Sequence, residues 1–189
     1  MRKDYEIILN LIPENSKVLD IGCSDGELIT YLENKGISAQ GVELSQEKVI
    51  KCLEKGLDVI HGDINLIVED FPFNQFDYCL LTQTIQAVQE PDQLLNTLKK
   101  VSKNIIVSFN NSARLSKISN FLLTGSFDSL LKKANSDHWY NTDYIHPCSI
   151  KDFKKLATVL DLKIISTFDV LSQKKFENGK SPSNLFCKE

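Results

Sequence analysis

Apolar residues recur along the chain in two alternating patterns. Short apolar or β-branched runs, which predict buried strands, are separated by segments with apolar residues every three or four positions, which predict amphipathic helices. The expected strands span residues 17–21, 38–44, 57–61, 76–81, 104–109, 162–169 and 183–188. The expected helices span residues 4–11, 26–35, 45–55, 91–101 and 149–160, with weaker helical pieces at 112–123 and 127–134.

The order of these elements predicts the fold class. Strands that alternate with helices form a mostly parallel sheet with helices on both faces. The last two strands are joined by a loop rich in Lys, Gly, Pro and Asn, which is too short for a parallel crossover. We therefore expect one Rossmann-like α/β domain over residues 1–189, with a seven-stranded, mostly parallel sheet that has one antiparallel edge hairpin strand. A short helical lid is expected as an insertion at about residues 110–148.

Composition and charge are those of a globular protein, which we expect in the cytoplasm. A length of 189 residues suits one domain, and a net charge of −3 gives no basis for a nucleic-acid partner. The five cysteines form no C-x-x-C pair and have no His at metal-ligand spacing, so we expect reduced thiols and no metal. No apolar segment is long enough for a signal peptide or a membrane span, so we expect no membrane association.

The turn after the first expected strand carries the strongest candidate chemistry. Asp20 lies at the strand end, and Gly22 and Gly26 let the following turn approach a ligand, at which the next helix points its amide groups. A carboxylate here suits an ammonium group and is a poor neighbour for a pyrophosphate. The glycines also run G-x-S-x-G rather than G-x-G-x-x-G, which disfavours nicotinamide binding. The alternative is a tight strand-to-helix turn that binds no ligand.

Acidic residues also follow the second and third expected strands. Glu43 can accept hydrogen bonds from two ribose hydroxyls, as acids do at the corresponding place in dinucleotide-binding folds. Asp63 can accept a hydrogen bond from an adenine amino group, and Gly62 leaves room for the base. Because parallel strands bring their carboxyl ends to one edge of a sheet, these acids together with Asp20 predict a nucleoside-binding site at that edge.

Several stretches resemble known families. Residues 18–28, VLDIGCSDGEL, resemble the first motif of class I S-adenosylmethionine-dependent methyltransferases. Residues 76–88, 106–111 and 139–153 resemble more narrowly the MetW family of methionine biosynthesis proteins. The resemblance covers the chain up to about residue 165. It implies the class I methyltransferase fold, with S-adenosylmethionine as cofactor and S-adenosylhomocysteine as product.

Two positions depart from the family pattern. Ser24 stands where the family usually has the middle glycine of the turn, and it would be unfavourable there if the backbone needs a positive φ. The stretch at residues 110–112 lacks the proline that follows the fifth strand in the family. We expect the second departure to change how the lid leaves the sheet.

The resemblance also implies roles for residues at the strand ends. Asp20 and the two glycines of the turn would hold the methionine end, Glu43 the ribose and Asp63 the adenine. Thr82 and Gln83 would line the methionine side and the floor of an acceptor pocket. The expected cofactor contacts are Asp20, Gly22, Cys23, Ser24, Gly26, Glu43, Leu44, Gly62, Asp63, Ile64, Thr82 and Gln83.

Candidates for catalysis and acceptor binding lie mainly in the expected lid. His146, just before the helix at 149–160, is the first candidate for a base or an acceptor-orienting group, and His138 is the second. The alternative for His146 is a loop or helix cap made through a backbone hydrogen bond. The expected acceptor contacts are Gln86, Trp139, Tyr140 and Tyr144.

Two classes of function fit these expectations. The first is a methyltransferase acting on a small polar metabolite, which a short lid without an appended recognition domain favours over a polymer acceptor. The second, implied by the MetW resemblance, is a sensing partner that binds S-adenosylmethionine and supports a homoserine O-acyltransferase. No residue decides between them: the lack of a clear acid–base pair favours the partner, and the aromatic lid favours the enzyme.

Overall fold

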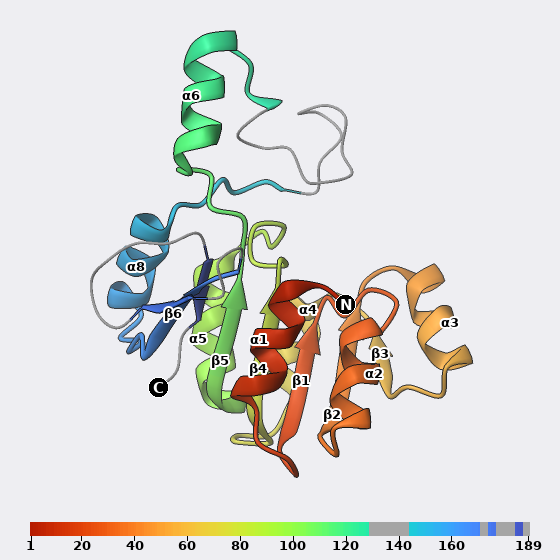
Figure 1. Ribbon diagram of the computed structural model, residues 1–189. Helices are drawn as coiled ribbons and strands as arrows, with labels where there is room; N and C mark the ends of the chain where they lie inside the picture. Colours follow the sequence, from red (N-terminus) through yellow and green to blue (C-terminus); the bar gives the residue numbers. More distant parts are fainter. Residues whose placement is uncertain (129–143, 171–173, 177–183, 187–189) are drawn as a thin grey trace.

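A five-stranded parallel sheet forms the centre of the molecule. The computed structural model describes residues 1–128, 144–170, 174–176 and 184–186 (Figure 1). The sheet has the strand order β3-β2-β1-β4-β5. Its strands are β1 (Lys17–Ile21), β2 (Ser38–Glu43), β3 (Val59–His61), β4 (Phe76–Thr82) and β5 (Ser102–Ser108). The strand order reverses between β1 and β4, which is where open α/β sheets bind their ligands.

The expectation of one seven-stranded sheet is wrong. Strand β6 (Ser166–Asp169) pairs antiparallel with β7 (Lys174–Phe176) and β8 (Asn184–Phe186) in a separate sheet of order β7-β6-β8. The two last expected strands do pair antiparallel, as β6 with β8, but they form no hairpin because β7 lies between them in the chain. Strand β8 lies next to β5 without joining its ladder. Strand β7 was not predicted, because a short Lys-containing edge strand has the composition of a loop.

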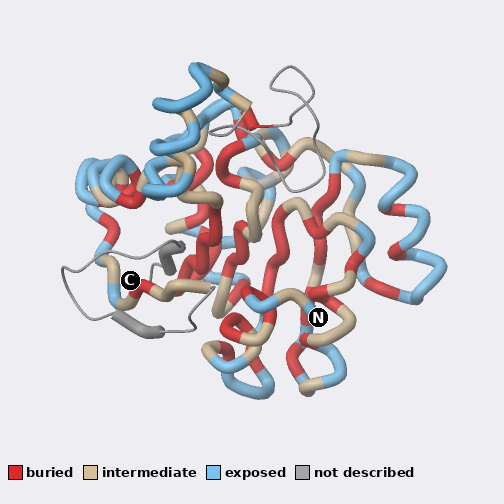
Figure 2. Tube along the Cα trace, turned by 45° about the horizontal axis from the view of Figure 1, so that its top comes forward, coloured by how far each residue is buried: buried red, intermediate tan, exposed pale blue. Residues whose placement is uncertain are grey.

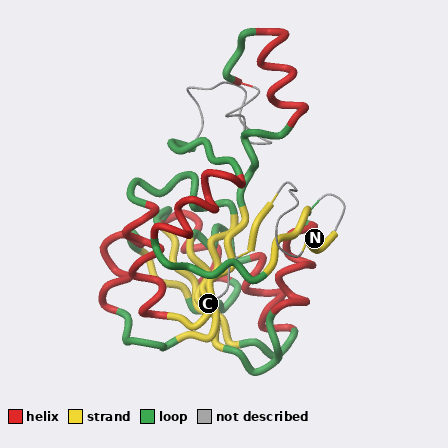
Figure 3. The backbone as a smooth tube through the Cα atoms, turned by 90° about the vertical axis from the view of Figure 1, so that its left-hand side faces the viewer, coloured by secondary structure: helices red, strands yellow, loops and turns green. Residues whose placement is uncertain are grey.

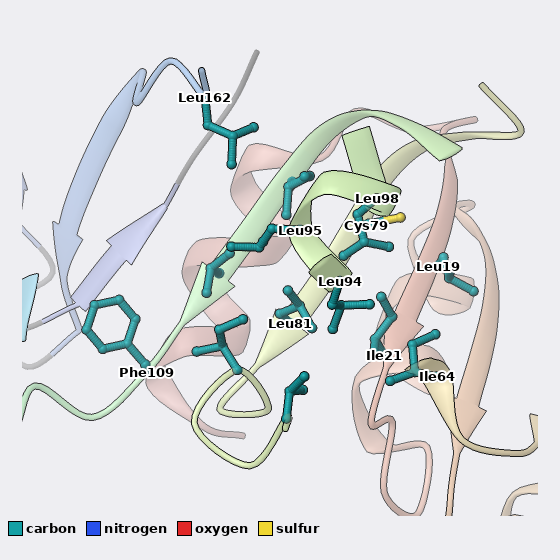
Figure 4. Packing of buried hydrophobic residues seen from close by; sticks show 14 of the residues in the cluster. Leu19, Ile21, Ile64, Cys79, Leu81, Leu94, Leu95, Leu98, Phe109 and Leu162 are labelled. Atoms are coloured by element: carbon teal, nitrogen blue, oxygen red, sulfur yellow. The ribbon is translucent and has the colours of Figure 1, made fainter. Parts of the chain in front are cut away.

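Helices cover both faces of the parallel sheet (Figure 1). On one face α1 and α2 pack against the sheet through buried residues that include Ile8 and Leu32. On the other face α5 and α8 do so, with Leu94, Leu95 and Leu98 of α5 directed at the sheet (Figure 4). The helices are α1 (Lys3–Leu11), α2 (Glu27–Asn34), α3 (Gln46–Glu54), α4 (Ile64–Ile67), the 3-10 turn η1 (Val68–Asp70), α5 (Pro91–Val101), α6 (Leu115–Thr124) and α8 (Ile150–Val159).

Local sequence signals explain where several helices begin. The N-cap expected at Ser149 is confirmed: its hydroxyl accepts from the backbone N–H of Asp152 at 3.1 Å, and the Asp152 carboxylate accepts in return, which completes a capping box at the start of α8. Pro91 occupies the first turn of α5, where its missing N–H costs no hydrogen bond. The weak helical signal at 112–123 is confirmed as α6, and most of the expected helix at 127–134 lies outside the described residues.

Helix α6 differs from the other long helices, because none of its residues is buried. It stands clear of the sheet and its covering helices in two views (Figures 1 and 3), whereas buried residues concentrate along the strands (Figure 2). The chain leaves the sheet and returns to it at one place, where Asn111 forms an isolated β-bridge with Cys148. Residues between these two form the region expected to be the lid, of which 129–143 lie outside the described part.

Candidate functional site

The three acidic residues singled out in the sequence lie at the carboxyl edge of three neighbouring strands. Asp20 is in β1, Glu43 ends β2, and Asp63 follows β3 by two residues. Parallel pairing in the order β3-β2-β1 brings these strand ends together. The arrangement inferred from the sequence, with acids gathered at one edge, is therefore present in the fold.

Asp20 is the most unusual of the three, because its carboxyl group is enclosed by protein. The residue is 2% exposed, and its Oδ1 atom has no hydrogen-bond partner among the described residues. Burial raises the pKa of the Asp20 carboxyl to about 7, Arg2 lowers it in part, and Glu43 raises it further. A buried carboxyl with a free acceptor atom fits a bound cation such as an ammonium group.

Glu43 joins the turn after β1 to the start of α3. Its Oε2 accepts a hydrogen bond from the backbone N–H of Ser24 at 2.8 Å, and its Oε1 accepts from that of Ser45 at 2.9 Å. Each carboxylate oxygen has a second lone pair. Glu43 can therefore fix the turn and still accept hydrogen bonds from two ribose hydroxyls.

The turn between β1 and α2 adopts left-handed backbone angles at three of its residues. Gly22 and Gly26 have φ values of 72° and 76°, and Ser24 has 55°. A Cβ at position 22 would lie 2.7 Å from the Oγ1 of Thr84, so this glycine is needed for both its conformation and its size. The backbone at position 24 does adopt a positive φ, which is unfavourable for a serine.

A cavity of about 560 Å³ opens beside this turn, at the ends of β1, β2 and β3. Among the expected cofactor contacts it is lined by Gly22, Glu43, Leu44, Gly62, Asp63 and Ile64. One oxygen of Asp63, Oδ1, accepts from the backbone and side-chain nitrogens of Asn65 at 2.9 and 2.8 Å. Five polar lining residues were not predicted from the sequence, namely Ser45, Lys48, Asn65, Thr84 and Gln89.

The remaining expected cofactor contacts lie on or behind the same edge, outside the lining of the cavity. Cys23 is buried, and burial holds the pKa of its thiol far above the usual range, so the thiol stays protonated. Thr82 ends β4, and its buried hydroxyl oxygen has no partner among the described residues. Gln83 follows with a left-handed φ of 59°, and its N–H donates to the carbonyl of Ser108 at 2.9 Å.

The expected acceptor contact Gln86 is enclosed at the base of the lid. It is 1% exposed; its Oε1 accepts from the Asn110 N–H at 2.9 Å, and its Nε2 donates to the Asn110 carbonyl at 3.2 Å and the His146 carbonyl at 3.4 Å. Tyr144 is also buried and accepts through its hydroxyl from Asn110 Nδ2 at 3.0 Å. These contacts tie the ends of β4 and β5 to the returning segment.

The catalytic candidates stay predictions. The ring Nε2 of His146 lies 3.0 Å from the carbonyl oxygen of Gln89, and the backbone N–H of His146 donates to the Gln86 carbonyl. These contacts match the alternative role of His146, a loop cap made through backbone hydrogen bonds. His138, Trp139 and Tyr140 lie outside the described residues. Within the described part of the chain, no group of His, Cys, Asp or Glu is placed to hold a metal ion.

Two further findings bear on expectations from composition. The cysteines in the described ranges, Cys23, Cys52, Cys79 and Cys148, are all free thiols. Among the described residues, none of the helices has the length and apolar character needed to cross a membrane.

Known proteins share this fold. A methyltransferase from Archaeoglobus fulgidus, described as dependent on S-adenosylmethionine, aligns with a TM-score of 0.61 and 18% identity over 95% of this chain and 80% of its own. A possible histamine N-methyltransferase from Thermotoga maritima aligns with a TM-score of 0.67 and 17% identity over 99% and 88% of the two chains. At such identities the likeness shows the fold alone.

The parallel sheet with acids at its carboxyl edge therefore has the Rossmann-like fold of the class I methyltransferases. The family model of the methionine biosynthesis protein MetW matches residues 2–189, and the chain belongs to this family. A bifunctional methionine biosynthesis protein MetXA/MetW from Rhodopirellula baltica is 30% identical over 191 aligned residues, which include 95% of this chain. This chain spans about 30% of the length of that relative.

Proposed function

We propose that this chain binds S-adenosylmethionine at the carboxyl edge of its sheet and transfers the methyl group to a small polar metabolite. The observation that carries the proposal is the buried Asp20 carboxyl, whose free Oδ1 lies at the end of β1 and needs a cationic or donor partner. The ammonium group of the methionine end supplies such a partner. A site without a ligand would leave this carboxyl buried at a cost in stability.

The cavity beside the turn supports binding of the adenosine end. Its volume of about 560 Å³ falls within the usual range for small-molecule sites. Glu43 would hold the ribose hydroxyls, and Asp63, with one oxygen left for a ligand, would accept from the adenine amino group. A Cβ at Gly62 would meet the side chain of Ile67 at 3.2 Å, so a glycine lets the chain pass close to α4 here.

S-adenosylmethionine supplies a methyl group on a sulfonium sulfur that is already activated for displacement. The protein therefore has to orient the acceptor, exclude water and remove a proton where the acceptor carries one. His146 and His138 are the residues proposed to hold that proton. Gln86, Trp139, Tyr140 and Tyr144 are proposed to shape the acceptor side, the first and last of them from buried positions.

The test is an incubation with S-adenosylmethionine labelled in the methyl group and a fractionated metabolite extract. Label that appears in a small polar product supports the enzyme. Absence of labelled product, in protein shown by calorimetry to bind S-adenosylhomocysteine, overturns methyl transfer while leaving cofactor binding in place. The Glu43→Gln variant is the blank for background transfer.

A second function is favoured by the unburied helix α6. Leu115, Leu122 and Leu123 of this helix are 80%, 76% and 86% exposed, which is unusual for three leucines on one short helix. The name of the relative from Rhodopirellula baltica joins MetXA and MetW activities in one chain. We propose as the alternative that α6 contacts a homoserine O-acyltransferase and that cofactor binding regulates this partner.

The alternative is tested by measuring the acyltransferase activity of a purified homoserine O-acyltransferase with and without this chain. A rise in activity that is lost in the Leu122→Ser/Leu123→Ser variant supports the partner role. The same activity with and without the chain overturns it. Because both leucines are exposed, the variant is expected to fold, and Lys117→Ser on the same helix serves as the control.

A further inference from the structure

Residues 84–89, between β4 and α5, belong to two structures at once, and we call them the shared segment. The cavity beside the turn after β1 is lined in part by Thr84, Ala87, Val88 and Gln89. The same segment also holds the place where the chain leaves the sheet toward α6 and returns to it. A movement that separates the shared segment from the returning chain therefore also disturbs the wall of the cavity.

On the cavity side, the shared segment is fixed to the core and to β1. Ile85 and Val88 are buried in the apolar cluster that α5 forms with the sheet. The hydroxyl of Thr84 donates to the carbonyl of Ile21, the last residue of β1, at 3.0 Å. Because closely packed interiors resist small displacements, the segment holds one position relative to the cavity as long as these contacts persist.

On its other side, the shared segment fastens the chain on both sides of α6. The backbone N–H groups of Ile145 and His146 both donate to the Gln86 carbonyl, at 2.9 and 3.0 Å. The Gln86 side chain bonds to the N–H and the carbonyl of Asn110, just beyond β5. The ring Nε2 of His146 lies 3.0 Å from the Gln89 carbonyl oxygen. All of these contacts, which we call the lid anchor, end on the shared segment, and α6 extends from the sheet beyond them (Figure 1).

We propose that the lid anchor couples occupancy of the cavity to the attachment of the chain that carries α6. A ligand that contacts the shared segment binds while the anchor is formed and not while it is broken, so it stabilises the formed anchor. By the same linkage, a molecule that pulls α6 away and breaks the anchor lowers the affinity for the ligand. The inference rests on the proposed binding of S-adenosylmethionine, and it gives a physical route by which that binding would regulate a partner on α6.

Hydrogen exchange of single amides, followed by NMR with S-adenosylhomocysteine as the ligand, tests the coupling. An amide that exchanges through local opening responds to a ligand only where that opening also disturbs the ligand's site. At a ligand concentration of about 100 times Kd, the amides of Asn110, Ile145 and His146 should exchange at least about tenfold more slowly, with about 100-fold as the limit. The amides of Lys117 and Ile118, bonded within α6, open without breaking the anchor and should change by less than about twofold.

A pair of threonine variants tests the part played by the shared segment. Thr84→Val keeps the size of the side chain and removes the hydroxyl that ties the segment to Ile21, so the slowing by ligand should fall by about threefold. Thr97→Val removes a comparable hydroxyl bond, to the Gln93 carbonyl within α5, and should keep the wild-type slowing. Both variants are compared at the same multiple of their own Kd. Equal slowing in the two variants overturns the role of the shared segment.

The outcomes keep this inference apart from the proposed function. Ligand binding in calorimetry, with unchanged exchange at Asn110, Ile145 and His146, overturns the coupling while the proposed cofactor site stands. Equal slowing at the anchor and within α6 also overturns it, because the ligand then stabilises the whole region and not the anchor. Folded wild-type protein that binds no ligand overturns the proposed function and the coupling with it.

Discussion

The two sides of the sheet's carboxyl edge are built in different ways. On the donor side, at the ends of β1 and β2, Asp20 and Glu43 are buried, and Glu43 is bonded to Ser24 and Ser45 of the turns around it. On the acceptor side, beyond β5, the chain continues into α6, which buries none of its residues. The donor site is thus fixed by the folding of the sheet itself.

The buried strand ends suit the binding of one fixed ligand, whereas the exposed helix α6 suits contact with a variable acceptor or a partner. A buried site gains affinity because its groups are held in place before the ligand arrives. An exposed helix has few contacts to hold it, so its position can respond to another molecule. Variants on the donor side should therefore change ligand affinity or global stability, whereas variants on α6 should change neither.

The largest effect is expected for Glu43→Gln on the donor side. The change removes the charged acceptor for two ribose hydrogen bonds, each of which contributes about 1.5–3 kcal/mol, so affinity for S-adenosylhomocysteine should fall at least about 100-fold. Calorimetry measures the loss. Glu47→Gln removes an exposed carboxylate of α3 and should keep the wild-type affinity. An unchanged affinity in the Glu43 variant would place the ribose elsewhere.

Asp20→Asn should stabilise the protein while it weakens ligand binding. The pKa of this carboxyl is 3.8 ordinarily and about 7 in the fold, so the folded state holds the proton more tightly than the unfolded chain. Stability from Asp20 is therefore fully present below about pH 4 and lost as the pH rises through 7, by about 4 kcal/mol at most.

Thermal unfolding of wild type and Asp20→Asn at several pH values checks this prediction. At pH 8 the variant should melt at the higher temperature, because asparagine avoids a buried charge. At pH 5 the difference should be less than half as large, because the folded-state carboxyl is protonated while the unfolded one is mostly ionised, and below pH 4 the two proteins should nearly coincide. A variant that is less stable at pH 8 would show that Asp20 is ionised and paired in the folded state.

Gln86→Ala tests whether the base of the lid is structural. The change removes three hydrogen bonds and leaves the Asn110 N–H and carbonyl without these partners, so the free energy of unfolding should fall by about 2 kcal/mol. Denaturant unfolding measures this, and Gln93→Ala on the exposed side of α5 is the control. Affinity for S-adenosylhomocysteine should stay the same. A loss of affinity instead of stability would assign Gln86 to the ligand.

The smallest effect is expected for Ser24→Gly, a change in the turn between β1 and α2. Glycine removes the cost of a left-handed backbone at φ 55°, and the protein should gain about 0.5–1 kcal/mol in stability. Ser45, with an ordinary φ of −80°, provides the reverse control, since Ser45→Gly should destabilise. Equal effects of the two changes on the unfolding midpoint would show that the angle at Ser24 carries no cost.

The donor side could be predicted from the sequence to a large extent. A short apolar run with an acid at or near its end marks a strand end, and parallel pairing then brings Asp20 and Glu43 to one edge. The sequence could not reveal Thr84, which closes the cavity next to Gly22, because the contact depends on how a loop folds back after β4.

The second sheet and the acceptor side were less predictable for physical reasons. Strand β7 is a three-residue edge strand with two lysines, and its composition does not differ from that of a loop. Helix α6 has apolar residues at helical spacing, and this pattern predicts a buried face that the fold does not provide. Periodicity predicts that a helix forms, but it does not predict what packs against the apolar face of that helix.

Above all, we propose that the acidic residues at the carboxyl edge of β1, β2 and β3 bind S-adenosylmethionine and its product. The most direct test is a calorimetric titration of the wild-type chain with S-adenosylhomocysteine at neutral pH. Saturable binding with one ligand per chain is the expected result. If folded protein gave no binding heat at ligand concentrations up to about 1 mM, where even weak sites fill, the claim would be wrong.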